Sequence, residues 1–276
     1  MRRVPLMRCL LAACRVAISL VAITATSPPL SAEDSVDTAL VIAVDVSQSV
    51  DQDRYKMQMN GIAAAFEDRE VIAAITSGAN GQILITLIAW SDAAVTAMPW
   101  TLVANAEDAL RVARIIRALQ PTTGEFTCLA RMLRTIQVNT LSQIPLTANR
   151  VVVDVSGDGI DNCDDTPATG VERDLIVAAG GTINGLPIII KGENDEIVGS
   201  GAYRKPGYDI NNLSPDKDST TLDAWYKKHV IGGRGSFIMA AKGYEDFGRA
   251  FRQKFVTEVS GRQLPPSQND LRLAKQ

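Results

Sequence analysis

The chain has 276 residues, of which 46% are hydrophobic, 21% charged and 5% aromatic, and this globular composition argues against a disordered or collagen-like protein. It carries 28 Lys and Arg against 31 Asp and Glu, a net charge of −3, so it is a poor candidate for binding nucleic acid, whose phosphates must be neutralised. The single histidine, His229, excludes a metal site with several histidine ligands and disfavours a histidine-dependent catalytic triad.

The first 32 residues have the features of a secretory signal peptide. Three arginines within the first eight residues precede a clean apolar stretch at 16–25, which is too short to span a bilayer but suits export. Cleavage is expected between Ala32 and Glu33. A lipoprotein signal at Cys14 and an uncleaved anchor fit less well, because the apolar run continues past Cys14 and Arg15 interrupts it. The mature protein is therefore expected to be exported, either periplasmic or secreted, with no transmembrane segment.

The mature chain alternates apolar strands with amphipathic helices. Runs rich in β-branched residues predict strands, and apolar residues that recur every three or four positions predict helices. In chain order we expect a strand at 38–46, a helix at 53–75, a turn at 76–81, strands at 82–90 and 95–102, helices at 106–119 and 128–138, a strand at 150–155, a helix at 171–179, a strand at 182–191, a helix at 220–230, a strand at 236–241 and a helix at 244–259.

This alternation predicts an α/β fold with three layers. A doubly wound, mostly parallel sheet of the Rossmann-like kind would be covered by helices on both faces. The segment at 95–102 holds Pro99 and is expected to be an antiparallel edge strand. We expect one domain over 33–260, with a polar surface insertion at 192–219 and a flexible tail at 261–276.

Oxygen-bearing side chains follow two of the strands and precede one helix. Asp45, Ser47 and Ser49 end the first strand, Thr127 lies before the helix at 128–138, and Asp158 follows the strand at 150–155. Ligands of open α/β sheets sit beyond the carboxyl ends of the strands, so these side chains are expected to converge there. Two carboxylates with three hydroxyls suit one hard divalent cation, Mg²⁺ first, with Mn²⁺ or Ca²⁺ as the other candidates.

Asp45-x-Ser47-x-Ser49, the later Thr127 and the strand-end Asp158 resemble the metal ion-dependent adhesion site of von Willebrand factor type A (vWA) domains. The order of strands and helices is similar to that family over roughly residues 36–260. The segments at 182–188 and 230–237 resemble a bacterial exported branch of it that has no assigned function. The resemblance implies that the three hydroxyls bind the metal directly and that the two carboxylates bind it directly or through water.

The loop before the threonine departs from the family pattern. Family members usually have a pair of glycines shortly before the threonine, whereas this loop reads Thr122-Thr123-Gly124-Glu125-Phe126-Thr127. Thr127 is preferred because the helix start after it matches the family, and Thr122 and Thr123 remain alternatives.

Other interpretations of these residues are weaker. Each motif alone is an ordinary strand-end turn or helix cap, and Asp51 or Asp53 is expected to cap the first helix. The segment 154–165 approximates a calcium-binding loop, but it follows a strand and ends in Asp rather than the usual Glu. Trp225 and Tyr226 are interpreted as packing residues, and His229 is assigned no function.

Two cysteines remain after the expected cleavage, Cys128 and Cys163. They lie one residue after Thr127 and five residues after Asp158, on loops that must meet at the metal. Because an exported protein meets oxidising conditions, we expect a disulfide that fastens the two loops together.

These features favour a binding module over an enzyme. The sequence lacks the nucleophile elbow of α/β hydrolases and the phosphate-binding loop of nucleotide hydrolases, and it offers no convincing general base. The vWA resemblance implies a divalent cation with an open position, which an Asp or Glu side chain of a protein partner fills. A metal-dependent phosphoesterase or a calcium-binding structural domain is the alternative.

Overall fold

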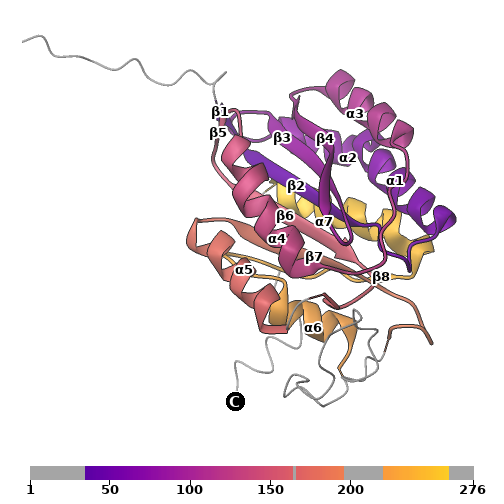
Figure 1. The fold of residues 1–276 in the computed structure, drawn as a ribbon. Coiled ribbons are helices and arrows are strands. Elements are labelled where there is room, and N and C mark those ends of the chain that lie inside the picture. The colour runs from indigo at the N-terminus through magenta and orange to yellow at the C-terminus, as the bar shows by residue number, and fades with distance from the viewer. Residues whose placement is uncertain (1–34, 164–165, 196–219, 261–276) are drawn as a thin grey trace, which may run out of the picture. The chain divides into compact units, whose positions relative to one another are not determined.

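The computed structural model describes residues 35–163, 166–195 and 220–260 (Figure 1). The expected signal peptide, the expected tail and most of the expected insertion at 192–219 lie outside these ranges. Within them, no helix combines the length and the apolar character needed to cross a bilayer.

A six-stranded sheet forms the centre of the described residues. In spatial order its strands are β4 (Ala94–Val103), β3 (Ile83–Trp90), β2 (Thr38–Asp45), β6 (Val151–Gly157), β7 (Thr182–Ile189) and β8 (Ala241–Lys242). All neighbouring pairs are parallel except β3 and β4, so the predicted antiparallel edge strand is confirmed. The register shifts where Thr86 opposes Pro99 and Trp100, a bulge of the kind that proline produces at a sheet edge.

Alternating side chains of the central strand β2 pack on opposite faces of the sheet. Leu40, Ile42 and Val44 belong to one hydrophobic cluster, whereas Val41 and Ala43 belong to the other. All eight residues of β2 are buried, because both faces are covered. This is the burial expected for a central strand of a doubly wound sheet.

Seven α-helices within the described ranges form the outer two layers. The helices α1 (Gln52–Glu67), α2 (Arg69–Thr76), α3 (Ala106–Ala118) and α7 (Phe247–Ser260) supply the first cluster. The helices α4 (Leu129–Thr135), α5 (Thr166–Ala178) and α6 (Leu222–His229) line the other face, where Figure 1 shows them side by side. The predicted three-layer α/β fold is therefore confirmed.

The prediction of one continuous helix at 53–75 is wrong. The helix breaks at Asp68, whose backbone is extended with φ −76° and ψ 132°. The Asp68 side chain accepts hydrogen bonds from the backbone N–H groups of Glu70 and Val71, at 2.8 and 3.2 Å. Asp68 therefore caps a second helix, just as Asp51 caps the first by accepting from Asp53 and Arg54.

The strand expected at 236–241 is also mostly wrong. Only its last residue belongs to β8, and the earlier part contacts β7 through a few bonds, including one from the Phe237 N–H to the Asn184 side chain at 3.0 Å. Gly233 and Gly235 have positive φ angles of 91° and 73° and turn the chain, and after this turn a single parallel bridge between Gly185 and Ile238 joins the segment to β7 before β8 begins. The helix expected at 244–259 begins with a 3₁₀ turn at Tyr244–Asp246 before α7.

Two short strands and the end of the helix expected at 128–138 differ from the prediction. A two-residue strand β1 (Ser35–Val36) pairs in parallel with β5 (Thr147–Ala148). The helix α4 continues through one π-helical turn at Ile136–Thr140 and a 3₁₀ turn at Leu141–Gln143. Strands of two residues carry no periodicity that a sequence pattern could reveal.

Candidate metal centre

Three loops meet at the carboxyl edge of the sheet. β2 ends at Asp45, and its neighbour β6 ends one residue before Asp158. Ser49, in the turn between β2 and α1, donates from its hydroxyl to Asp158 Oδ1 at 2.7 Å. The parallel arrangement of β2 and β6 thus brings together residues that are 109 positions apart.

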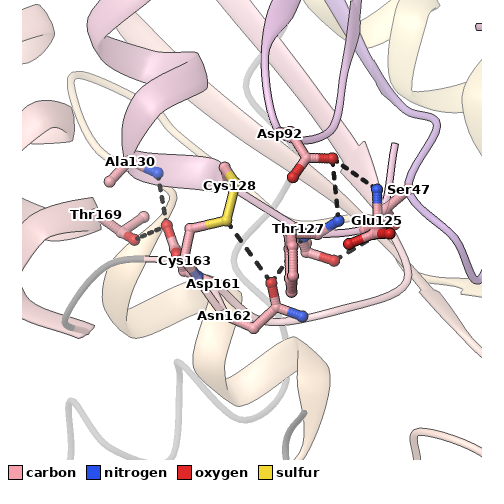
Figure 2. Close-up of a disulfide and its surroundings, with 11 residues drawn as sticks. Ser47, Asp92, Glu125, Thr127, Cys128, Ala130, Asp161, Asn162, Cys163 and Thr169 are labelled. Carbon is pink, nitrogen blue, oxygen red and sulfur yellow. Dashed lines mark hydrogen bonds between the residues drawn. A yellow bond between two sulfur atoms is a disulfide. The ribbon is translucent and has the colours of Figure 1, made fainter. Parts of the chain in front are cut away.

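The hydroxyl groups of the site form a chain of contacts. Ser47 Oγ lies 3.3 Å from Ser49 Oγ. The Thr127 hydroxyl donates to Ser47 Oγ at 3.4 Å (Figure 2). Thr122 and Thr123 instead line an open cavity of about 590 Å³ beside Ser47. The structure therefore places all five expected residues in one cluster, in which Thr127 contacts Ser47.

Asp45 is the most deeply buried member of the cluster, with no exposed surface. Its Oδ1 accepts from the Ser47 N–H at 2.8 Å, whereas its Oδ2 has no hydrogen-bond partner. Burial and the charge of Asp158 raise the pKa of Asp45 to about 8, and burial also raises the pKa of Asp158. A divalent cation fits this arrangement, because it would offset the repulsion between two buried carboxylates and pair with the free oxygen.

Asp158 is held by residues that the sequence analysis did not identify. The Tyr244 hydroxyl donates to Asp158 Oδ2 at 2.9 Å, and Arg54 Nη1 lies 4.0 Å from the same oxygen. The Asn194 side-chain amide donates to the Asp158 carbonyl at 2.6 Å. Tyr244 begins the 3₁₀ turn before α7 and Asn194 lies in the turn after β7, and neither belongs to a motif that could have marked it in the sequence.

Gly157 allows β6 to approach the site closely. A Cβ atom on this residue would lie 2.7 Å from the Tyr226 hydroxyl and 2.9 Å from Asp45 Oδ2, which is closer than side chains tolerate. Tyr226 is buried against the sheet, in agreement with its interpretation as a packing residue, but its hydroxyl also borders the site.

The expected disulfide between Cys128 and Cys163 is present beside the site (Figure 2). The Asn162 side chain accepts from the Thr127 N–H at 2.8 Å, and the Asn162 N–H donates to the Thr127 carbonyl at 3.1 Å. Asp161 accepts from the Ala130 N–H at 2.7 Å and so ties the same loop to the start of α4. The disulfide and these hydrogen bonds together fix the loop that carries Thr127.

The residues of the alternative calcium loop have other contacts. Asp154 is buried on β6, where its Oδ1 lies 2.5 Å from Lys254 Nζ. Asp161 binds Ala130 and the Thr169 hydroxyl. No group of three or more His, Cys, Asp or Glu residues suited to a metal occurs within the ranges that the structure describes.

Comparisons with known proteins identify a family and a shared fold. A family model described as "Protein of unknown function (DUF1194)" matches residues 35–263. No curated protein matches the sequence. Many solved structures share the fold.

Three of these structures are proteins of adhesive or matrix assemblies. Proximal thread matrix protein 1 from the mussel byssus is 14% identical with a TM-score of 0.54, over 82% of this chain and 48% of that one. The vWF domain of the type V pili tip protein Mfa5 from Porphyromonas gingivalis is 11% identical with a TM-score of 0.52, over 85% and 99%. The pilus adhesin SpaC from Lactobacillus rhamnosus GG is 11% identical with a TM-score of 0.51, over 82% and 30%. The chain thus spans about half the length of the mussel protein, and identities this low show the fold alone.

Proposed function

The chain belongs to the family described as protein of unknown function DUF1194 and has a vWA fold, and on this basis we propose that it is a metal-dependent protein-binding module. The observation that carries the proposal is the convergence of two buried carboxylates and three hydroxyls at one sheet edge, with Asp45 Oδ2 left unpaired.

One divalent cation would be held by Asp45, Ser47, Ser49, Thr127 and Asp158. Oxygen donors of this kind favour hard cations, so Mg²⁺ is the first candidate and Mn²⁺ or Ca²⁺ the next. When bound, the cation supplies a positive charge that attracts a carboxylate. Because three of the five donors are neutral hydroxyls, they leave that charge less compensated than a set of carboxylates would.

The partner we propose is a protein that offers an Asp or Glu side chain to this cation. By analogy, the pili tip protein and the pilus adhesin that share the fold support a role in protein contacts. Export of the protein to the periplasm or beyond would fit such a role.

The test is calorimetric titration of the purified protein with Mg²⁺, Mn²⁺ and Ca²⁺. We expect one cation per chain in the wild type and no binding in Asp45→Ala, because this change removes the buried carboxylate. Asp158→Ala and Ser47→Ala should weaken binding or remove it. Asp53→Ala is the control, because it removes an exposed carboxylate from the first turn of α1, outside the cluster.

Thermal or urea unfolding gives an independent measurement. A cation at about 100 times its dissociation constant should stabilise the wild type by roughly 2.7 kcal/mol, since it binds only the folded chain. Equal binding to the wild type and to Asp45→Ala, or no binding to either, would show that the cluster is a set of strand-end caps rather than a metal site.

A further inference from the structure

Arg54 brings a fixed positive charge to the edge of the candidate metal centre. It lies in the first turn of α1, where its Nη1 donates to the Ser49 carbonyl at 2.9 Å and lies 4.0 Å from Asp158 Oδ2. The Tyr244 ring lies 5.2 Å from the centre of the guanidinium. These contacts orient the guanidinium next to two of the proposed metal ligands.

The second nitrogen of this guanidinium binds a carboxylate of the protein itself. Arg54 Nη2 donates to both carboxylate oxygens of Glu193, at 2.9 and 2.8 Å. The Glu193 side chain is 53% exposed and the Arg54 side chain 25% exposed. Ion pairs this accessible contribute little to stability, so Glu193 can be replaced on Arg54 by another carboxylate at little cost.

We propose that Arg54 is a second anchor for the acidic side chain of the partner, and that Glu193 occupies this anchor until the partner arrives. The proposal rests on the metal-dependent capture described above. A carboxylate has two oxygens, so one can face the cation while the other accepts a hydrogen bond from Arg54. The planar guanidinium suits such paired recognition, because its N–H groups have fixed directions.

The anchor would make the site selective for carboxylates and would make Glu193 a competitor of the partner. A neutral side chain could approach the cation but would gain little from Arg54. Glu193 holds its position through a short turn after β7, where Asn194 also binds the Asp158 backbone. The loop that contacts the metal centre thus also carries the competing carboxylate.

The same helix provides a matched control pair. At the far end of α1, Glu67 receives two hydrogen bonds from the Arg117 guanidinium of α3. The two side chains are 38% and 39% exposed. Arg117→Gln and Glu67→Gln therefore make the same chemical changes in an ion pair at the other end of α1, away from the metal centre.

The experiment measures binding of a short acidic peptide, acetyl-Gly-Asp-Gly-amide, by NMR titration. Mg²⁺ binding to each variant is measured first by calorimetry, and the peptide is then added at saturating Mg²⁺. We expect Arg54→Gln to weaken peptide binding about tenfold or more, as for loss of a charge-assisted hydrogen bond. Glu193→Gln should tighten it about two- to fivefold, since it frees Arg54 at the cost of a weak exposed pair. Both control variants should match the wild type.

Two further titrations separate an anchor from a general charge effect. Arg54→Lys keeps the charge but loses the forked geometry, so its affinity should fall between those of the wild type and Arg54→Gln. The Asn version of the peptide should bind weakly and equally to all variants.

The possible failures are distinguishable. A wild type that binds no Mg²⁺ would overturn the proposed function itself. Normal Mg²⁺ binding with an unchanged peptide affinity in Arg54→Gln would overturn the anchor alone. A Glu193→Gln variant that binds the peptide no more tightly than the wild type would overturn the competing role of Glu193.

Discussion

Removal of the Cys128–Cys163 disulfide should both destabilise the protein and weaken Mg²⁺ binding at the candidate metal centre. The bridge joins the residue after Thr127 to the loop that follows Asp158, and both sulfur-bearing residues are almost fully buried. The loss can be produced by the double substitution Cys128→Ala and Cys163→Ala, which leaves no unpaired thiol at either position.

The expected magnitude follows from the length of chain that the bridge closes. The two cysteines are 35 residues apart, and the chain-entropy model gives about 4 kcal/mol for a loop of this size. The urea dependence of the unfolding free energy is at most about 3 kcal/mol per molar for proteins of ordinary size, so the unfolding midpoint should fall by more than about 1 M urea.

Urea unfolding of the oxidised wild type and of the double variant measures this change directly. Mg²⁺ calorimetry on the same samples should show weaker binding in the variant, because the loop that carries Thr127 is then held by hydrogen bonds without the covalent link. A shift of less than about 0.3 M urea would refute the entropic argument. Two free thiols titrated in the unreduced, unfolded chain that begins at Glu33, which lacks Cys9 and Cys14, would refute the bridge.

Two further predictions concern buried charges. Burial and the charge of Asp158 raise the pKa of Asp45 to about 8, so Mg²⁺ must displace a proton from Asp45 at neutral pH. Calorimetry should therefore show the affinity of the protein for Mg²⁺ rising by up to about tenfold per pH unit between pH 6 and 8, and levelling at higher pH. Because the pKa of Asp45 is raised, the folded, cation-free protein binds this proton more tightly than the unfolded chain does. The contribution of Asp45 to the free energy of unfolding, measured with urea, should therefore fall as the pH rises from about 4 to 8. A pH-independent Mg²⁺ affinity would contradict both expectations. Lys254 is fully buried between Asp154 and Glu258, with its Nζ 2.5 Å from each carboxylate. Lys254→Met should lower the free energy of unfolding, measured with urea, by about 3–5 kcal/mol, because it leaves two buried carboxylates without this cation. A loss below about 1 kcal/mol would show that these carboxylates do not depend on Lys254.

The sequence was sufficient for features that depend on local chemistry. The apolar run at 38–46 could bury its side chains only if both faces of the strand were covered, and β2 is indeed buried on both faces. Pro99 cannot donate to a neighbouring strand, which marked β4 as an edge. Asp45, Ser47 and Ser49 follow a strand directly, so their place at the carboxyl edge followed from the strand itself.

The sequence was insufficient where one side chain competes with a periodic pattern. The apolar spacing at 53–75 continues through Asp68, yet a side chain that can accept two backbone N–H groups ended one helix and began another there. The strand expected at 236–241 failed similarly, because Gly233 and Gly235 turn the backbone and Asn184 takes the Phe237 N–H.

The sequence by itself therefore determined the layers, the edge strand and the residues that bear oxygen at the candidate site. Only the tertiary structure decided which groups surround them, because hydrogen bonds and charges act between atoms in space and not between positions in a chain. Tyr244 and Arg54 reach Asp158 from 86 and 104 residues away, and neither carries a motif. The free oxygen of Asp45 and the pairing of Arg54 with Glu193 became visible only when the three layers had been assembled.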